Sequence, residues 1–157
     1  LTALARSLDL LTSRNWGDAS LIELIRAQLD VFGIDADRVE LDGENFEIRS
    51  GAVKDFGMML HEMATNATKY GALSGDGDDG KIAVRWKVAR ASDGAEVFHL
   101  SWTESGGPLV TPPSRKGFGS RMIEQALAGY FNGSAELNYA PEGLSFMLQA
   151  PLAGLTI

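Results

Sequence analysis

The sequence contains no cysteine, and His61 and His99 are its only histidines. Without cysteine there can be no disulfide bond, thiolate metal site or cysteine nucleophile, and two histidines are too few for an ordinary zinc centre. The sequence also lacks an apolar run of the roughly 20 residues that a membrane-spanning helix requires, and nothing in it resembles a signal peptide. We therefore expect a soluble, cytoplasmic domain.

Basic residues are scarce as well: 14 lysines and arginines stand against 21 aspartates and glutamates, a formal charge of −7. They form no cluster, which argues against a nucleic-acid partner, and we expect no membrane contact from this segment. Hydrophobic residues make up 45% of the 157 residues, which is enough for one core in one domain but not for two full domains.

The first 14 residues carry leucines at positions 1, 4, 8 and 11, a spacing that predicts an amphipathic helix in need of a partner. This helix either packs on its own domain or ends a preceding one. Because the chain begins at Leu1 without methionine and already inside a helical pattern, we expect it to be a piece of a longer protein.

Two further helices are predicted in the first half of the chain. Residues 21–32 form one of them, which Asp18 or Ser20 can cap and which Gly33 would end as a residue that tolerates positive φ. The central segment, residues 52–71, forms the other, because its apolar residues recur at spacings of three and four. That apolar stripe consists of Val53, Phe56, Leu60, Ala64 and Ala67.

A second face of the central helix brings together one carboxylate, one amide, one ammonium and one phenol group, those of Glu62, Asn66, Lys69 and Tyr70. An amide can ligate a hard cation, a carboxylate can orient a water, and a lysine can contact phosphate oxygens. The set is suited to a magnesium nucleotide. The alternative is an ordinary solvated helix face, so the rest of the chain has to decide between the two.

Alternating apolar and polar residues predict three hairpins. The first spans residues 38–49 around Asp42-Gly43, the second joins 81–90 to 96–104, and the third joins 134–140 to 144–152. Links of this kind favour an α+β fold over a doubly wound one. We expect a two-layer α/β sandwich with a mixed, mostly antiparallel sheet and helices on one face.

A long loop at residues 105–120 contains four glycines and three prolines, which prevent regular structure, and a helix over 120–131 is predicted to follow it. Gly117-Phe118-Gly119 lies directly before that helix, where free backbone N–H groups and the helix dipole favour an anion. Taken alone this is a weak signal, because neither a P-loop sequence nor a βαβ unit surrounds the glycines.

Three segments, in order, resemble the N, G1 and G2 boxes of the catalytic ATP-binding domain of histidine kinases: HEMATNATKYGALS at 61–74, WTESGGP at 102–108 and KGFGSRMIE at 116–124. These kinases share the Bergerat fold with gyrase, the heat-shock chaperone of ninety kilodaltons and MutL. A histidine in the N box together with Trp102-x-Glu104 resembles the HWE subfamily in particular. The resemblance covers residues 20–151.

The resemblance implies a role for each residue of the N box. Asn66 would bind the Mg²⁺ that bridges the phosphates, Lys69 would contact phosphate, and Tyr70 would pack near the adenine. Glu62 matches the glutamate that orients or deprotonates the attacking group, which makes it the expected catalytic residue. ATP and Mg²⁺ are therefore the expected cofactors.

The other two boxes complete the implied nucleotide site. The usual G1 aspartate is replaced by Glu104, which would accept a hydrogen bond from the adenine amino group, while Gly106, beside Gly107, would let the backbone approach the base. In the G2 box, Gly117 and Gly119 would cradle phosphates. The remaining candidate nucleotide contacts are Arg115, Lys116, Phe118, Ser120 and Arg121, although an unpaired surface role fits the three basic residues about as well.

The resemblance also divides the chain: residues 1–19 would end the dimerisation and phosphoacceptor region, and residues 20–157 would form the catalytic domain. The expected function is transfer of the ATP γ-phosphate to a histidine on upstream helices, absent here, and from there to an aspartate of a response regulator. These helices and that regulator are the expected partners, and a homodimeric full-length protein is left open. The alternatives are a nucleotide-dependent protein-binding module and an anti-sigma-type serine kinase on the same fold.

Overall fold

The structure is a computed structural model that describes residues 19–74, 79–108 and 133–155. The helices are α2 (Leu21–Val31) and α3 (Ser50–Lys69), with short 3₁₀ turns η1 (Ala36–Arg38) and η3 (Leu152–Gly154). The strands are β1 (Ala19–Ser20), β2 (Val39–Asp42), β3 (Glu47–Ile48), β4 (Lys81–Arg90), β5 (Glu96–Ser105), β6 (Ser134–Ala140) and β7 (Gly143–Pro151). The predicted helices over 1–14 and 120–131 lie outside the described residues.

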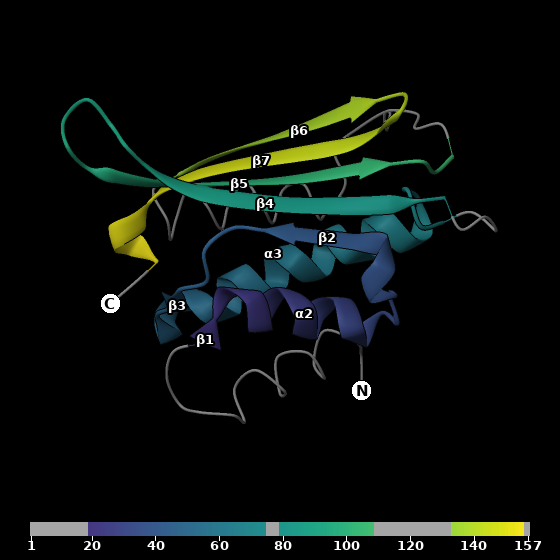
Figure 1. The fold of residues 1–157 in the computed structure, drawn as a ribbon, viewed down its shortest axis with the longest axis horizontal. Helices are drawn as coiled ribbons and strands as arrows, with labels where there is room; N and C mark the ends of the chain where they lie inside the picture. The colour runs from purple at the N-terminus through teal and green to yellow at the C-terminus, as the bar shows by residue number, and fades with distance from the viewer. Residues whose placement is uncertain (1–18, 75–78, 109–132, 156–157) are drawn as a thin grey trace.

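The main sheet has five strands in the order β2-β4-β5-β7-β6. β4 and β5 form one antiparallel hairpin, and β6 and β7 form another, so both of these predicted hairpins are confirmed. β5 and β7 join the two hairpins, again antiparallel, whereas β2 runs parallel to β4 at the edge. Both described helices lie against the same face of this sheet, which confirms the predicted two-layer α+β fold (Figure 1).

The predicted hairpin over residues 38–49 is wrong. β2 pairs with β4 in the main sheet, and β3 pairs with β1 in a separate two-stranded sheet. Trp86 explains the difference: its Nε1 donates to the Glu44 carbonyl at 2.8 Å, and its indole lies where a side chain on Gly43 would be. The chain after β2 is therefore held against β4 instead of turning back on itself.

The helices begin and end close to the predicted positions. Ser20 caps α2, because its Oγ accepts a hydrogen bond from the Glu23 N–H at 3.1 Å. Gly33 follows α2 with a φ of +67°, the left-handed conformation that glycine adopts without strain. In α3 the whole predicted apolar stripe is buried.

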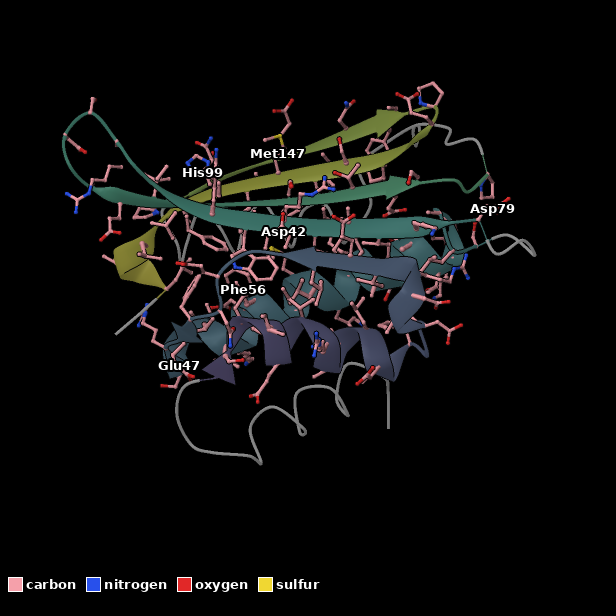
Figure 2. The ribbon with its side chains drawn as sticks, in the orientation of Figure 1. Asp42, Glu47, Phe56, Asp79, His99 and Met147 are labelled. Carbon is pink, nitrogen blue, oxygen red and sulfur yellow. The ribbon has the colours of Figure 1, made fainter. Side chains whose placement is uncertain are left out.

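Aromatic side chains fill the space between the layers. Phe56 points from α3 toward the sheet (Figure 2), where its ring meets that of Phe98 edge-on at a centroid distance of 6.0 Å. His99 and Met147 point the opposite way, away from the helices (Figure 2). Within the described ranges, no helix is both long and apolar enough to cross a membrane.

Candidate functional site

The polar face of α3 occupies its last two turns and the residue that follows. Glu62 and Asn66 are half-buried, Lys69 is exposed, and Tyr70 is 75% exposed. The Asn66 carbonyl accepts the N–H groups of Tyr70 and Gly71, at 2.9 and 2.8 Å, which ends the helix. The Asn66 side-chain amide has no hydrogen-bond partner among the described residues, so it is available to a ligand.

Burial raises the pKa of Glu62, and the positive charge of Lys69 two turns later partly offsets this shift. A half-buried carboxylate with a raised pKa beside a lysine is a common feature of sites that handle protons or charged ligands. Glu62 therefore has the chemistry of a base or an orienting group, and its catalytic role stays a prediction.

Glu104 lies at the end of β5 and is only 2% exposed. Its Oε1 accepts the Ala72 N–H at 3.0 Å, and its Oε2 accepts the Trp102 Nε1–H at 2.9 Å. Burial raises the pKa of Glu104, and the two hydrogen bonds act against that shift. The carboxylate thus joins the end of β5 to the segment that follows α3, and the two halves of the predicted site meet here.

Glycine is required around this junction for close packing. A side chain on Gly71 would collide with the Glu104 carboxylate, and one on Gly107 would collide with the backbone of Ala72. Gly106 has a φ of +74°, and a side chain there would collide with the Asp79 carbonyl. Packing within the chain therefore accounts for these glycines, and the expected approach of Gly106 to a base stays a prediction.

His61 is a half-buried residue whose role the sequence leaves open. Its Nδ1 is buried without a hydrogen-bond partner, and its ring lies 5.2 Å from the Phe32 ring, centroid to centroid. Burial lowers the pKa of His61, and the charge of Lys69 lowers it further. The imidazole thus packs from α3 against Phe32, which directly follows α2, where burial disfavours its protonation.

A Mg²⁺ ion fits this site only together with the nucleotide. Among the described residues there is no group of three or more histidine, aspartate or glutamate side chains that could hold a metal ion. The Asn66 amide oxygen is a suitable hard ligand, and Mg²⁺ commonly takes one or two protein ligands plus phosphate oxygens and waters. The residues present therefore match a metal that phosphates bring with them.

Two features of the site were not predicted from the sequence: the Ala72 N–H as a partner of Glu104, and the hydrogen bond from Trp102. The second could have been found, because residues i and i+2 of a strand lie on the same face. Seven predicted contacts lie outside the described residues: Arg115, Lys116, Gly117, Phe118, Gly119, Ser120 and Arg121.

The fold is that of histidine kinase catalytic domains. A histidine kinase domain from a blue-light activated histidine kinase of Erythrobacter litoralis superposes with a TM-score of 0.64 at 15% identity, over 96% of this chain and 78% of that one. The mycobacterial sensor histidine kinase MprB superposes with a TM-score of 0.59 at 17% identity, over 85% of this chain and 97% of that one.

The sequence comparisons indicate which group of histidine kinases this chain resembles. Residues 1–45 match the model of the family described as HWE histidine kinase. Over 153 residues the chain is 32% identical to the blue-light-activated histidine kinases of Brucella anthropi and Brucella ovis. The match covers 97% of this chain but only 30% and 31% of those two proteins. The chain is therefore related to the HWE histidine kinases, as its sequence motifs predicted, and spans less than a third of these relatives.

Proposed function

We propose that this chain binds ATP with Mg²⁺ and transfers the γ-phosphoryl group to a histidine on upstream phosphoacceptor helices, from which a response-regulator aspartate receives it. The observation that carries the proposal is the Glu104–Ala72 hydrogen bond, which places the G1 carboxylate beside the end of α3. The resemblance assigns the adenine to Glu104, and it assigns the metal and the phosphates to the end of α3. A cytoplasmic location follows, because ATP is supplied there.

In this proposal each polar group of the site has one task. Glu104 accepts a hydrogen bond from the adenine amino group, the Asn66 amide oxygen ligates Mg²⁺, and Lys69 neutralises phosphate charge. Glu62 takes the proton of the incoming imidazole or orients that ring. An imidazole nitrogen bonds to the γ-phosphorus while the bond from that phosphorus to the β–γ bridging oxygen breaks, and ADP leaves. Such sites work mainly by positioning and electrostatic stabilisation, and the bound Mg²⁺ would neutralise charge on the leaving phosphates.

The remaining predicted contacts belong to the same proposal. Tyr70, which is 75% exposed, would cover the adenine once nucleotide is bound, and Gly106 and Gly107 would flank the base. The phosphates would rest on the backbone of Gly117 to Gly119, with Ser120 at the start of the next helix. The cations of Arg115, Lys116 and Arg121 would face the same anion.

Calorimetry of ADP binding tests the metal assignment. Asn66→Ala should remove most of the gain in affinity that Mg²⁺ gives, because the variant lacks the one predicted protein ligand of the ion. Asn138→Ala, on the exposed side of β6, is the matched control and should bind like the native chain. Equal binding by Asn66→Ala and native protein in Mg²⁺ would show that the ligand is misassigned.

A further inference from the structure

Trp102 and Glu104 form a buried pair on the inner face of β5, with exposed fractions of 1% and 2%. The Trp102 Nε1 donates to one carboxylate oxygen at 2.9 Å, and the Ala72 N–H donates to the other at 3.0 Å. In the described part of the chain, no lysine or arginine side chain pairs with Glu104. Two fixed N–H groups are thus its only hydrogen-bond partners there.

A buried carboxylate without a cationic partner destabilises the folded state, because its desolvation is not compensated by an ion pair. An apolar residue at this position would give a more stable core. Its presence here is therefore better explained by a ligand than by stability. An ionised carboxylate only accepts hydrogen bonds, and each oxygen retains capacity for a further donor. The group that completes this arrangement must bring a hydrogen-bond donor, such as an amino N–H, because a carbonyl oxygen would face negative charge.

We propose that Trp102 is a positioning residue for the nucleotide base: its indole N–H fixes the Glu104 carboxylate so that the free acceptor sites select a base with an exocyclic amino group. The proposal rests on the proposed ATP site and adds to it the origin of base selectivity. Trp102 would not touch the nucleotide. It would act only through the orientation and charge of Glu104.

The sheet supplies a matched control for the loss of an indole N–H. Trp86 on β4 is also buried, at 6% exposure, and its Nε1 donates to the Glu44 carbonyl at 2.8 Å. That carbonyl follows β2, at the opposite edge of the sheet from the β7–β6 pair. Both indoles point to the inner face, and each donates one hydrogen bond. Only the Trp102 indole donates to the Glu104 carboxylate. Trp102→Phe therefore removes a hydrogen bond to Glu104, whereas Trp86→Phe removes one to a backbone carbonyl.

The test compares ADP with inosine diphosphate, whose base carries a carbonyl in place of the amino group. Calorimetry in Mg²⁺ should give the native chain and Trp86→Phe the same preference for ADP. Trp102→Phe should reduce that preference about three- to tenfold, because Glu104 loses one of two orienting bonds. The hydrogen bond from Trp102 also favours the ionised carboxylate. On acidification, ADP affinity should therefore fall at a higher pH in Trp102→Phe than in the native chain.

Two results separate this inference from the function on which it rests. A native chain that binds no ADP would contradict the proposed function itself. ADP binding with unchanged base preference and pH profile in Trp102→Phe would overturn only the role of Trp102. Should Trp102→Phe fail to fold, as judged by circular dichroism, benzothienylalanine at position 102 replaces the N–H by sulfur at nearly constant shape. The preference for ADP over inosine diphosphate and the pH dependence of ADP affinity, measured on that protein, then test the role of the Trp102 N–H.

Discussion

His61 shows how one side chain can make the stability of the fold depend on pH. Its imidazole is half-buried with an unpartnered Nδ1, and burial holds its pKa below the ordinary value. The folded chain therefore binds a proton at His61 less readily than the unfolded chain does. Stability from this site is complete above the ordinary histidine pKa of about 6.5 and is lost as pH falls below it, through the lower pKa of the folded state.

We expect His61→Gln to lose less stability than the native chain between pH 7.5 and pH 5.5, because the variant has no group here that must be protonated. Urea unfolding at both pH values measures the difference. His99→Gln, which changes the chain's other histidine, on the outer face of the sheet, is the matched control. A native-like pH dependence in His61→Gln would place the acid sensitivity elsewhere.

At the scale of elements, the junction between α3 and β5 is built from backbone packed on backbone. Gly107 lies against the backbone of Ala72, whereas Gly51, at the start of α3, has only the flexible end of the Arg49 side chain near it. The same glycine-to-alanine change should therefore have opposite effects at Gly107 and Gly51.

Gly107→Ala should destabilise the fold by about 1–3 kcal/mol, because the added methyl group has no room. Gly51→Ala should be neutral or stabilise it by up to about 1 kcal/mol, because alanine favours a helix. Chemical denaturation followed by circular dichroism compares both variants with the native chain. Similar losses in the two variants would mean that the packing at Gly107 is not special.

Local patterns allowed the elements to be predicted, and long-range pairing was harder. The helices and the two confirmed hairpins depend on spacings within 10 to 25 residues, as with the cap at Ser20 and the buried stripe of α3. The position of β2 in the sheet depends on Trp86, more than 40 residues away in the sequence. The periodicity of a local segment carries no information about such a distant contact. The polar face of α3 was predicted from helical spacing and Glu104 through a family motif, but the Ala72 contact required the folded backbone.

At the scale of the whole molecule, the proposed reaction would depend on a phosphoacceptor histidine on helices upstream of this segment. Positioning a nucleophile in line with the γ-phosphate cannot be replaced by electrostatic stabilisation. The isolated 157 residues should therefore bind ATP without labelling themselves, and a chain with the upstream helices restored should form an acid-labile phosphohistidine. Glu62→Gln in the longer chain should slow transfer far more than it weakens binding.

Radiolabelled ATP with the short chain, the long chain and the Glu62 variant provides the measurement. Glu23→Gln, which changes an exposed acidic residue in the first turn of α2, is the matched control and should transfer phosphate at the native rate. Acid-stable label on the short chain would instead support the serine-kinase alternative. Equal transfer rates with and without the Glu62 carboxylate would remove its catalytic role.

The order of strands in the sheet has a consequence for the chain as it leaves the ribosome. β5 pairs with β7, so residues 143–151 must be synthesised before β5 gains its second neighbour. Until then β5 presents an open edge together with the apolar side chains of Phe98, Leu100 and Trp102. Open edges of this kind pair readily with other chains. Translation that stops short of β7 should therefore yield aggregates rather than a smaller folded domain.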